Sequence, residues 1–219
     1  MRTPSRIAVL ASGRGSNLQA ILDAIAAGRL DAQVVAVLSD KPEASALLKV
    51  APSQRWAHAP KAFGDRAAFD AALGDALQAH APDWIVCAGY MRILGADFVA
   101  RFSGRLLNIH PSLLPLYKGL HTHARALEAG DAEHGASVHF VVPELDAGTV
   151  LAQARVPVRP GDSAETLAQR VLAVEHPLLI ASLQLLVGGR VAERDGQLQL
   201  DGHPLFSPLR LDCAGQLQR

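Results

Sequence analysis

Residues 7–27 read IAVLASGRGSNLQAILDAIAA, and this stretch decides the fold class. Its first five residues form a short apolar run, which is typical of a buried strand. The segment after the turn carries apolar residues on one helical stripe and stops at Gly28. The residues of that stripe are Leu18, Ile21, Leu22 and Ile25. A buried strand that leads through a glycine-rich turn into a helix predicts the opening unit of a parallel α/β sheet.

The same alternation continues along the chain. Further strands are predicted at residues 34–38, 83–88, 105–110, 137–142 and 150–158, and helices at 44–50, 66–80, 122–129 and 163–187. The last two of these strands follow each other closely, which favours an antiparallel addition. Residues 190–200 form two short alternating runs around Asp195-Gly196, a strong hairpin signal. We therefore predict an α/β fold with a Rossmann-like, mostly parallel sheet flanked by helices, and antiparallel additions in the C-terminal half.

Domain organisation follows from length and from the lack of breaks. The chain has 219 residues, with no internal repeat and no long linker, so we expect residues 1–219 to form a single domain. The tail over residues 207–219 has no strong pattern, and we expect it to be loosely held.

Composition narrows the class of protein. Lysine plus arginine and aspartate plus glutamate number 21 each, a balance that argues against a broad nucleic-acid surface. Residues 1–6 are polar and the next apolar run has only five residues, so no signal peptide is expected. No stretch approaches the roughly 20 apolar residues of a spanning helix, and we expect no membrane partner. With only Cys87 and Cys213, a reducing, cytoplasmic location is expected.

The first turn is a candidate anion site. Residues 12–17, SGRGSN, join the first strand to the first helix, and ligands of open α/β sheets bind at the carboxyl ends of strands. Free amides at a helix start, together with the helix dipole, favour a phosphate. The dinucleotide fingerprint is absent, since it needs a glycine where Leu18 stands, and no Walker pattern occurs. A plain turn with a helix cap is the alternative.

A second candidate site lies at the end of the strand over residues 105–110. Asn108 and His110 are two apart, so their side chains point to the same face of that strand. An amide and an imidazole together can stabilise a developing oxyanion, and an imidazole can carry a proton near neutral pH. Asp146, in a turn-rich segment between two strands, is the best partner for His110, where it would fix the imidazole tautomer and raise the pKa of His110. An ordinary polar strand end and loop aspartate are the alternatives.

Other residues admit two interpretations each. His121 and His123 have a spacing that suits zinc, but two more ligands would be needed, so we expect no metal. Ser112 lacks the GxSxG context of a serine hydrolase. His139 is a core histidine or a pocket wall. Met91, Ile93 and Leu94, with Arg92 between them, form either an apolar slot for a flat ring or part of the core.

Several motifs, read in order, resemble the glycinamide ribonucleotide formyltransferases, a branch of the folate-dependent formyltransferase family. The segments that carry the resemblance are residues 11–18 (ASGRGSNL), 88–94 (AGYMRIL), 106–115 (LLNIHPSLLP), 119–123 (GLHTH), 134–140 (HGASVHF) and 144–148 (ELDAG). It extends from about residue 6 to about residue 200. The NIHPS block is shared by the wider family that uses formyltetrahydrofolate, whereas the GSN loop is more specific to the ribonucleotide branch.

The resemblance implies a role for each matching residue. Asn108, His110 and Asp146 match the catalytic residues, and Glu175 matches a glutamate that binds the acceptor. The loop for the ribonucleotide phosphate matches Gly15, Ser16 and Asn17. The folate site matches Arg66, Met91, Arg92, Ile93, Leu94, Asn108, Val142, Pro143, Glu144, Leu145 and Asp146. The resemblance also implies a cis bond before Pro115. On this basis the N-terminal half would bind the ribonucleotide and the C-terminal half the folate.

Three positions depart from the family pattern. Ala147 stands where glycine or threonine is common, and Lys118 stands where a proline is common. The usual Tyr-Pro pair after Glu175-His176 is missing, and Pro177 comes early, which is expected to alter the helix there.

The activity that the resemblance implies is transfer of a formyl group from 10-formyltetrahydrofolate, the co-substrate, to the amine of glycinamide ribonucleotide in purine biosynthesis. We expect that no metal takes part, that the partners are these two small molecules, and that the protein is a monomer or a homodimer. The alternative on the same residues is formyltetrahydrofolate hydrolysis, with water in place of the amine. That branch normally carries an extra N-terminal module, for which a first strand at Ile7 leaves no room. A phosphate-binding protein without catalysis is a further alternative, and the set of Asn108, His110 and Asp146 argues against it.

Overall fold

The structure is a computed structural model, and it describes residues 3–194 and 197–219. The chain forms two compact units, Met1–Asn108 and Ile109–Arg219. Each unit is described separately. That the whole chain acts as a single domain stays a prediction.

The first unit is built on a parallel sheet. Its strands are β1 (Ser5–Leu10), β2 (Ala32–Ser39), β3 (Arg55–Ala57), β4 (Trp84–Cys87) and β5 (Leu106–His110), whose last residues pass into the second unit. They lie in the order β3-β2-β1-β4-β5, and each neighbouring pair is parallel. The strands are apolar because they are buried; in β1, for example, the residues from Ile7 to Leu10 are fully buried.

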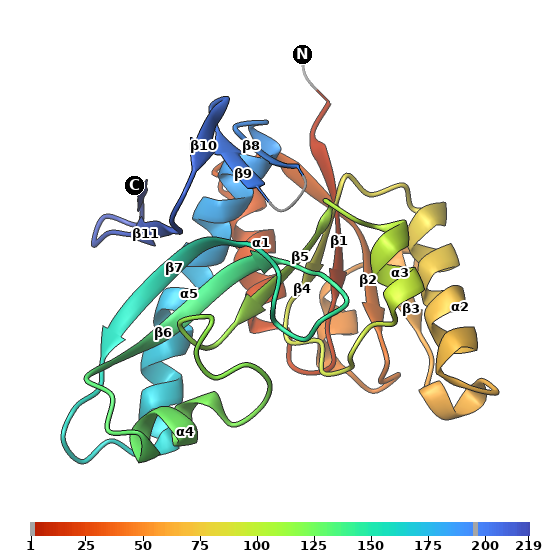
Figure 1. Cartoon of the computed structure of the whole chain (residues 1–219). Helices are drawn as coiled ribbons and strands as arrows, with labels where there is room; N and C mark the ends of the chain where they lie inside the picture. The colour runs from red at the N-terminus through yellow and green to blue at the C-terminus, as the bar shows by residue number, and fades with distance from the viewer. Residues whose placement is uncertain (1–2, 195–196) are drawn as a thin grey trace. The chain divides into compact units, whose positions relative to one another are not determined.

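Three α-helices accompany these strands. They are α1 (Ser16–Ala26), α2 (Arg66–Ala79) and α3 (Ala96–Arg101). In the apolar stripe of α1, Leu18 and Ile21 are buried and Leu22 and Ile25 are half-buried, whereas Phe69, Leu73 and Leu77 of α2, four residues apart, are all buried. Asp65 caps α2, accepting a hydrogen bond from the Ala68 amide at 2.8 Å. Figure 1 shows α2 and α3 side by side, and the two helices are in contact.

Short elements of the first unit differ from the prediction. The weak helix expected at residues 44–50 is a 3-10 helix, η1 (Ser45–Lys49), because Pro52 leaves no room for more turns. Two further 3-10 helices, η2 (Pro52–Gln54) and η3 (Pro60–Ala62), and the elements β3 and α3 were not predicted. A three-residue strand and a six-residue helix are too short to show a period.

The second unit contains the antiparallel additions. Strands β6 (Glu133–Phe140) and β7 (Val150–Pro157) pair antiparallel, as expected from their closeness in sequence. The hairpin prediction is also confirmed: β8 (Val191–Arg194) and β9 (Gln197–Leu200) pair antiparallel, while Asp195-Gly196 lie outside the described residues. Strand β10 (His203–Leu205) completes that small antiparallel sheet. The predicted α/β fold, mostly parallel with antiparallel additions in the C-terminal half, is confirmed.

The tail is more ordered than the sequence suggests. Strand β11 (Leu209–Leu211) pairs parallel with β7, and β12 (Leu217–Gln218) pairs antiparallel with β11. Leu209 is fully buried. The prediction that residues 207–219 are loosely held is therefore wrong for these strands. Burial of one leucine and pairing with a strand about 55 residues away are not visible in the local pattern.

Helix α5 (Ala164–Val187) packs along both β6 and β7 (Figure 1), and α4 (Thr122–Glu128) contacts α5. Ser163 caps α5 in a capping box with Thr166. Pro177 lies inside α5, and the helix continues through it. We expected Pro177 to alter the helix, but α5 is not interrupted there.

Helix α5 is longer and more apolar than the sequence analysis allowed when it found no stretch comparable to a spanning helix. Its 24 residues include a window of mean hydropathy 1.5, which is long and apolar enough to cross a membrane by length and composition. In the second unit this apolar surface covers β6 and β7, and ten residues of α5 are buried, Leu167, Val171 and Leu178 among them. An apolar core helix of this kind passes the same test as a spanning helix.

Candidate active site

The first turn has the geometry of an anion-binding loop. Gly15 is the N-cap of α1 and has φ 72°, in the left-handed region that favours glycine. A Cβ at Gly15 would also lie 2.7 Å from the Cβ of Ala46, so both backbone conformation and space require glycine. The next two residues, Ser16 and Asn17, begin the helix, with Ser16 exposed and Asn17 buried. The start of an eleven-residue helix, with its dipole and the exposed Ser16, thus suits a phosphate.

Ser12 joins this turn to the segment that follows β4. Its hydroxyl donates to Asp40 Oδ1 at 2.6 Å and accepts a hydrogen bond from the Met91 amide at 2.9 Å. Its own amide donates to the Gly89 carbonyl at 3.0 Å. Ser12 and Asp40 are both buried. Ser12 therefore connects the carboxyl ends of β1, β2 and β4. The sequence did not reveal this role, because serine is common in such turns.

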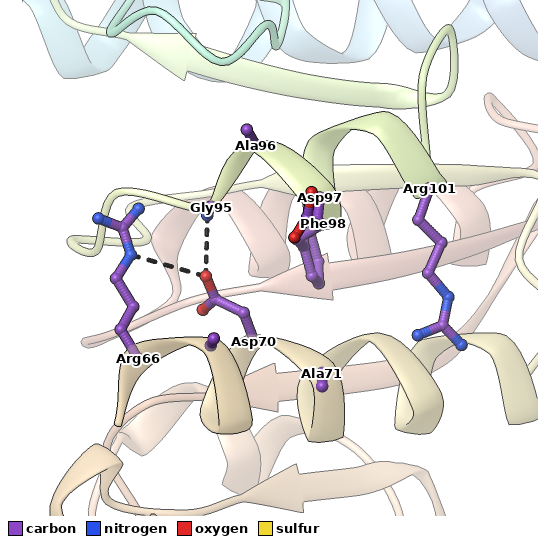
Figure 2. Close-up of a pocket in the computed structure, with 9 residues that line it drawn as sticks. Arg66, Asp70, Ala71, Gly95, Ala96, Asp97, Phe98 and Arg101 are labelled. Atoms are coloured by element: carbon purple, nitrogen blue, oxygen red, sulfur yellow. Dashed lines mark hydrogen bonds and ion pairs between the residues drawn. The ribbon is translucent and has the colours of Figure 1, made fainter. Parts of the chain in front are cut away.

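The structure brings Arg66 to the segment of residues 91–94. The Arg66 guanidinium donates to the Ile93 carbonyl at 2.7 Å and lies 3.6 Å from Asp70 Oδ2, as an ion pair. The same carboxylate oxygen accepts from the Gly95 amide at 2.8 Å (Figure 2). These contacts line a cavity between α2 and α3 whose walls also include Ala67, Ala71, Ala96, Asp97, Phe98 and Arg101.

The four residues of the predicted folate segment have different surroundings. Met91 and Ile93 are exposed by 63% and 54%, while Leu94 is buried. The Arg92 guanidinium lies over the Phe69 ring, 5.0 Å from its centroid. Two large apolar side chains exposed beside an arginine favour the ligand-slot interpretation for Met91 and Ile93, whereas Leu94 belongs to the core.

Asn108 and His110 lie on β5 with the alternation that the sequence predicts. Asn108 is half-buried, and it pairs in register with Cys87 of β4. His110 is 6% exposed.

Asp146 lies beside His110, as predicted. Its Oδ2 is 3.5 Å from His110 Nδ1, and its Oδ1 is 3.6 Å from His139 Nε2. The Gly119 amide donates to Oδ2 at 2.9 Å. Asp146 has φ 46°, and a Cβ at Gly148 would lie 1.8 Å from the Phe140 carbonyl oxygen, so this turn is tightly constrained. His139, left between two interpretations by the sequence, contacts this carboxylate from β6.

The ring nitrogens of the two histidines are assigned by their partners. His110 Nε2 lies 3.0 Å from the Tyr117 carbonyl oxygen, and His139 Nδ1 lies 2.9 Å from the Phe140 carbonyl oxygen. A carbonyl oxygen only accepts, so each of these nitrogens carries a hydrogen. The nitrogen of His110 that faces Asp146, Nδ1, is therefore the one that gains or loses a proton.

The pKa values of this cluster differ in one respect from the expectation. Burial lowers the pKa of His110; the hydrogen bond to the Tyr117 carbonyl and the charge of Asp146 raise it, but burial outweighs both. The expectation of a net raised pKa is thus wrong, although the direction of the Asp146 effect is right. For Asp146, burial raises the pKa, but hydrogen bonds from His139 and the Gly119 amide and the charge of His110 outweigh it, so the net pKa is lowered. The free protein at neutral pH therefore pairs a carboxylate with a neutral His110.

A buried polar network holds the base of the loop that follows His110. The Ser137 hydroxyl donates to the Ser112 carbonyl at 2.7 Å and accepts from the Leu114 amide at 3.1 Å. The Gln153 amide donates to the Leu114 carbonyl at 2.8 Å and to the Ser137 hydroxyl at 3.0 Å. The Leu114-Pro115 bond is cis, as the resemblance implies.

The remaining predicted residues are placed as follows. Val142 is half-buried, Pro143 and Glu144 are exposed, and Leu145 is 48% exposed, in the turn that carries Asp146. Glu175 is 9% exposed, in the middle of α5. Their roles toward a substrate stay predictions.

The histidines considered for zinc are engaged otherwise. His123 Nδ1 lies 3.2 Å from His134 Nε2, and their rings meet edge to face. His121 is exposed at the N-cap of α4. Among residues 3–194 and 197–219, no group of three or more His, Cys, Asp or Glu side chains is arranged to hold a metal ion.

Comparison with known proteins adds to this geometry. Residues 5–183 match the formyl transferase family. The phosphoribosylglycinamide formyltransferase of Escherichia coli K12 is 47% identical over 201 residues, which cover 91% of this chain and 95% of that protein. The solved structure of the phosphoribosylglycinamide formyltransferase of Coxiella burnetii, 45% identical, superposes with a TM-score of 0.87 over 92% of this chain and 96% of that one. A formyltetrahydrofolate deformylase from Pseudomonas syringae is 26% identical, with a TM-score of 0.79, and the match covers 90% of this chain and 65% of that one.

Proposed function

The chain belongs to the formyl transferase family, and on this premise we propose that it transfers the formyl group of 10-formyltetrahydrofolate to the amine of glycinamide ribonucleotide, a step of purine biosynthesis. The observation that carries the proposal is the buried pair of His110 and Asp146, which lies on the strand and turn that the resemblance marks as catalytic. The relatives named for this activity match more than nine-tenths of the chain.

The pair of His110 and Asp146 suits the chemistry of formyl transfer. The acceptor amine attacks the formyl carbon, and negative charge develops on the formyl oxygen. The amide of Asn108 donates to that oxygen, and the positive charge that develops on His110, on the same face of β5, stabilises it further. The amine must lose a proton and the folate nitrogen must gain one before the carbon–nitrogen bond to the folate breaks. His110 Nδ1 takes up this proton, the Asp146 carboxylate stabilises the imidazolium, and the proton then passes to the leaving nitrogen.

The binding residues are assigned in the same way. Gly15, Ser16 and Asn17 hold the phosphate of the ribonucleotide, since they lie at the N-terminus of a helix, whose dipole favours an anion. The resemblance assigns Arg66, residues 91–94 and residues 142–146 to the folate. Glu175 binds the acceptor.

Hydrolysis of formyltetrahydrofolate is the second candidate. The Pseudomonas syringae deformylase shares the fold, but at 26% identity and with only 65% of its length matched it is the more distant relative. We propose further that the protein acts in the cytoplasm as a monomer or homodimer, with no nucleic acid, membrane or metal as partner.

One assay separates the two functions. Purified protein is given 10-formyltetrahydrofolate with and without glycinamide ribonucleotide, and release of tetrahydrofolate is followed by absorbance. A transferase releases tetrahydrofolate only when the ribonucleotide is present. Equal release without it would establish the hydrolase. No release in either case would leave a binding protein without catalysis.

A further inference from the structure

The loop after β5 reaches back to the proposed catalytic pair. The carbonyl of Tyr117 accepts a hydrogen bond from His110 Nε2 at 3.0 Å, and the amide of Gly119 donates to Asp146 Oδ2 at 2.9 Å. One short segment therefore supplies a backbone acceptor to the imidazole and a backbone donor to the carboxylate. The orientation of both side chains depends on where this segment lies.

Tyr117 holds a backbone conformation that its residue type disfavours. Its φ is 55°, in the left-handed region, where a bulky side chain costs roughly 1–3 kcal/mol. Such a conformation persists only when surrounding contacts fix it. Gly119, two residues further on, also has a positive φ, of 80°.

The contacts that fix Tyr117 are made by its ring. The hydroxyl donates to Asp131 Oδ2 at 2.5 Å. The Arg125 guanidinium lies over the ring, 5.3 Å from its centroid, and donates to the Lys118 carbonyl at 2.7 Å. The His134 ring meets the Tyr117 ring edge to face, with centroids 6.0 Å apart. The Tyr117 side chain is thus held by a cation from α4, an aromatic ring from β6 and an anion from the turn between these two elements.

The anchored carbonyl decides which nitrogen of His110 reacts. Because the carbonyl only accepts, Nε2 keeps its hydrogen in both charge states of the ring. The other nitrogen, Nδ1, faces Asp146 at 3.5 Å. If the carbonyl moved away, the neutral ring could place its hydrogen on Nδ1, and the nitrogen that accepts a proton would point away from Asp146.

We propose that Tyr117 is a positioning residue for formyl transfer: its ring, anchored by Asp131 and Arg125, holds its own carbonyl against His110 Nε2 and so directs His110 Nδ1 toward Asp146. The inference rests on the proposed function of His110 and Asp146. Tyr117 contacts His110 only through its backbone, so the sequence motif gave no sign of it.

The test begins with Tyr117→Phe, which removes the hydrogen bond to Asp131 and keeps the ring. The loss of one hydrogen bond to a charged group predicts a fall in kcat of about tenfold, with the KM of both substrates little changed. Tyr90→Phe is the matched control, because the buried Tyr90 hydroxyl has no hydrogen-bond partner among the described residues. Its kcat should equal that of the wild type.

Variants of the partner test the anchor independently. Asp131→Asn keeps an acceptor for the Tyr117 hydroxyl and should retain most of the activity, whereas Asp131→Ala should lose as much as Tyr117→Phe. Since both remove the same bond, the double variant should be no slower than the slower single one. Additive losses would overturn the anchor.

A spectroscopic readout separates positioning from a general structural role. Nitrogen-15 NMR of labelled histidine reports the tautomer of His110, which should be the Nε2–H form in the wild type and a mixture in Tyr117→Phe. A wild-type tautomer in Tyr117→Phe, with or without loss of activity, would overturn the inference. His110→Ala serves as the reference. If it keeps full activity, the proposed catalytic site is wrong; if it is inactive while Tyr117→Phe behaves as wild type, only the positioning role is wrong.

Discussion

The Nδ1 atom of His110 lies 3.5 Å from a carboxylate oxygen of Asp146, and the two side chains are only 7% and 9% exposed. Little solvent separates them, so the charge state of each depends on the other. The His110 ring is anchored at its other nitrogen by the Tyr117 carbonyl. The relationship therefore fixes both the place and the direction of proton transfer in the proposed reaction.

The first prediction concerns the residues proposed to stabilise the formyl oxygen. Asn108→Ala and His110→Ala each remove one group from the face of β5. Loss of one such donor typically lowers turnover by about 10²–10³-fold. Steady-state kinetics should show this fall in kcat, while calorimetry shows both substrates still binding. Near-normal kcat in both variants would contradict the roles.

The second prediction concerns His139, which the sequence left undecided. Its hydrogen bond is one of the interactions that lower the pKa of Asp146, so His139→Phe should raise that pKa. Carbon-13 NMR of protein labelled at the aspartate carboxyl groups should show Asp146 titrating at a higher pH in the variant than in the wild type. An unchanged Asp146 titration would show that His139 is only part of the core.

The third prediction concerns Ser12, which joins the first turn to Met91. Ser12→Ala leaves the buried Asp40 carboxylate without one donor, and this should lower the free energy of unfolding by about 2 kcal/mol. The variant also removes the acceptor of the Met91 amide, so residue 91 should shift and the KM for folate should rise. Denaturant unfolding and kinetics check both effects. Ser103→Ala, at an exposed serine, is the control and should change neither.

The fourth prediction concerns acid stability. Burial lowers the pKa of His134 to about 4, from 6.5 in the unfolded chain. Between these two pH values the unfolded state binds more protons than the folded state, so the free energy of unfolding falls as the pH is lowered from 6.5 to 4. This one group accounts for up to about 3 kcal/mol.

Denaturant titrations at several pH values measure this slope. His134→Asn should flatten the pH dependence between pH 6.5 and 4, whatever its effect at neutral pH. The same slope in the variant would assign the acid sensitivity to other groups, of which His123 and His110 also have pKa values lowered by burial.

The long periodic elements were predictable because period and burial agree in them. The apolar stripe of α1 and the glycine turn before it predict that Gly15, Ser16 and Asn17 lie at the start of a helix, and they do. Alternation on β5 put Asn108 and His110 on one face, and the pairing of His110 with Asp146 was also anticipated.

What escaped prediction depends on contacts between distant segments. Strand β11 exists through its pairing with β7, and Leu209 alone gives no local pattern. The net pKa of His110 depends on burial, which the sequence does not display. Tyr117 acts through a carbonyl that every residue possesses, so its side chain gave no signal.

The destination of the formyl carbon tests the central claim most directly. The protein is supplied with 10-formyltetrahydrofolate labelled with carbon-13 in the formyl group, together with glycinamide ribonucleotide, and the products are followed by NMR. The account predicts that the label appears in the formamide of the ribonucleotide, and that His110→Ala lowers the rate of its appearance by about 10²–10³-fold. Label that appears in free formate, at the same rate with or without the ribonucleotide, would contradict it.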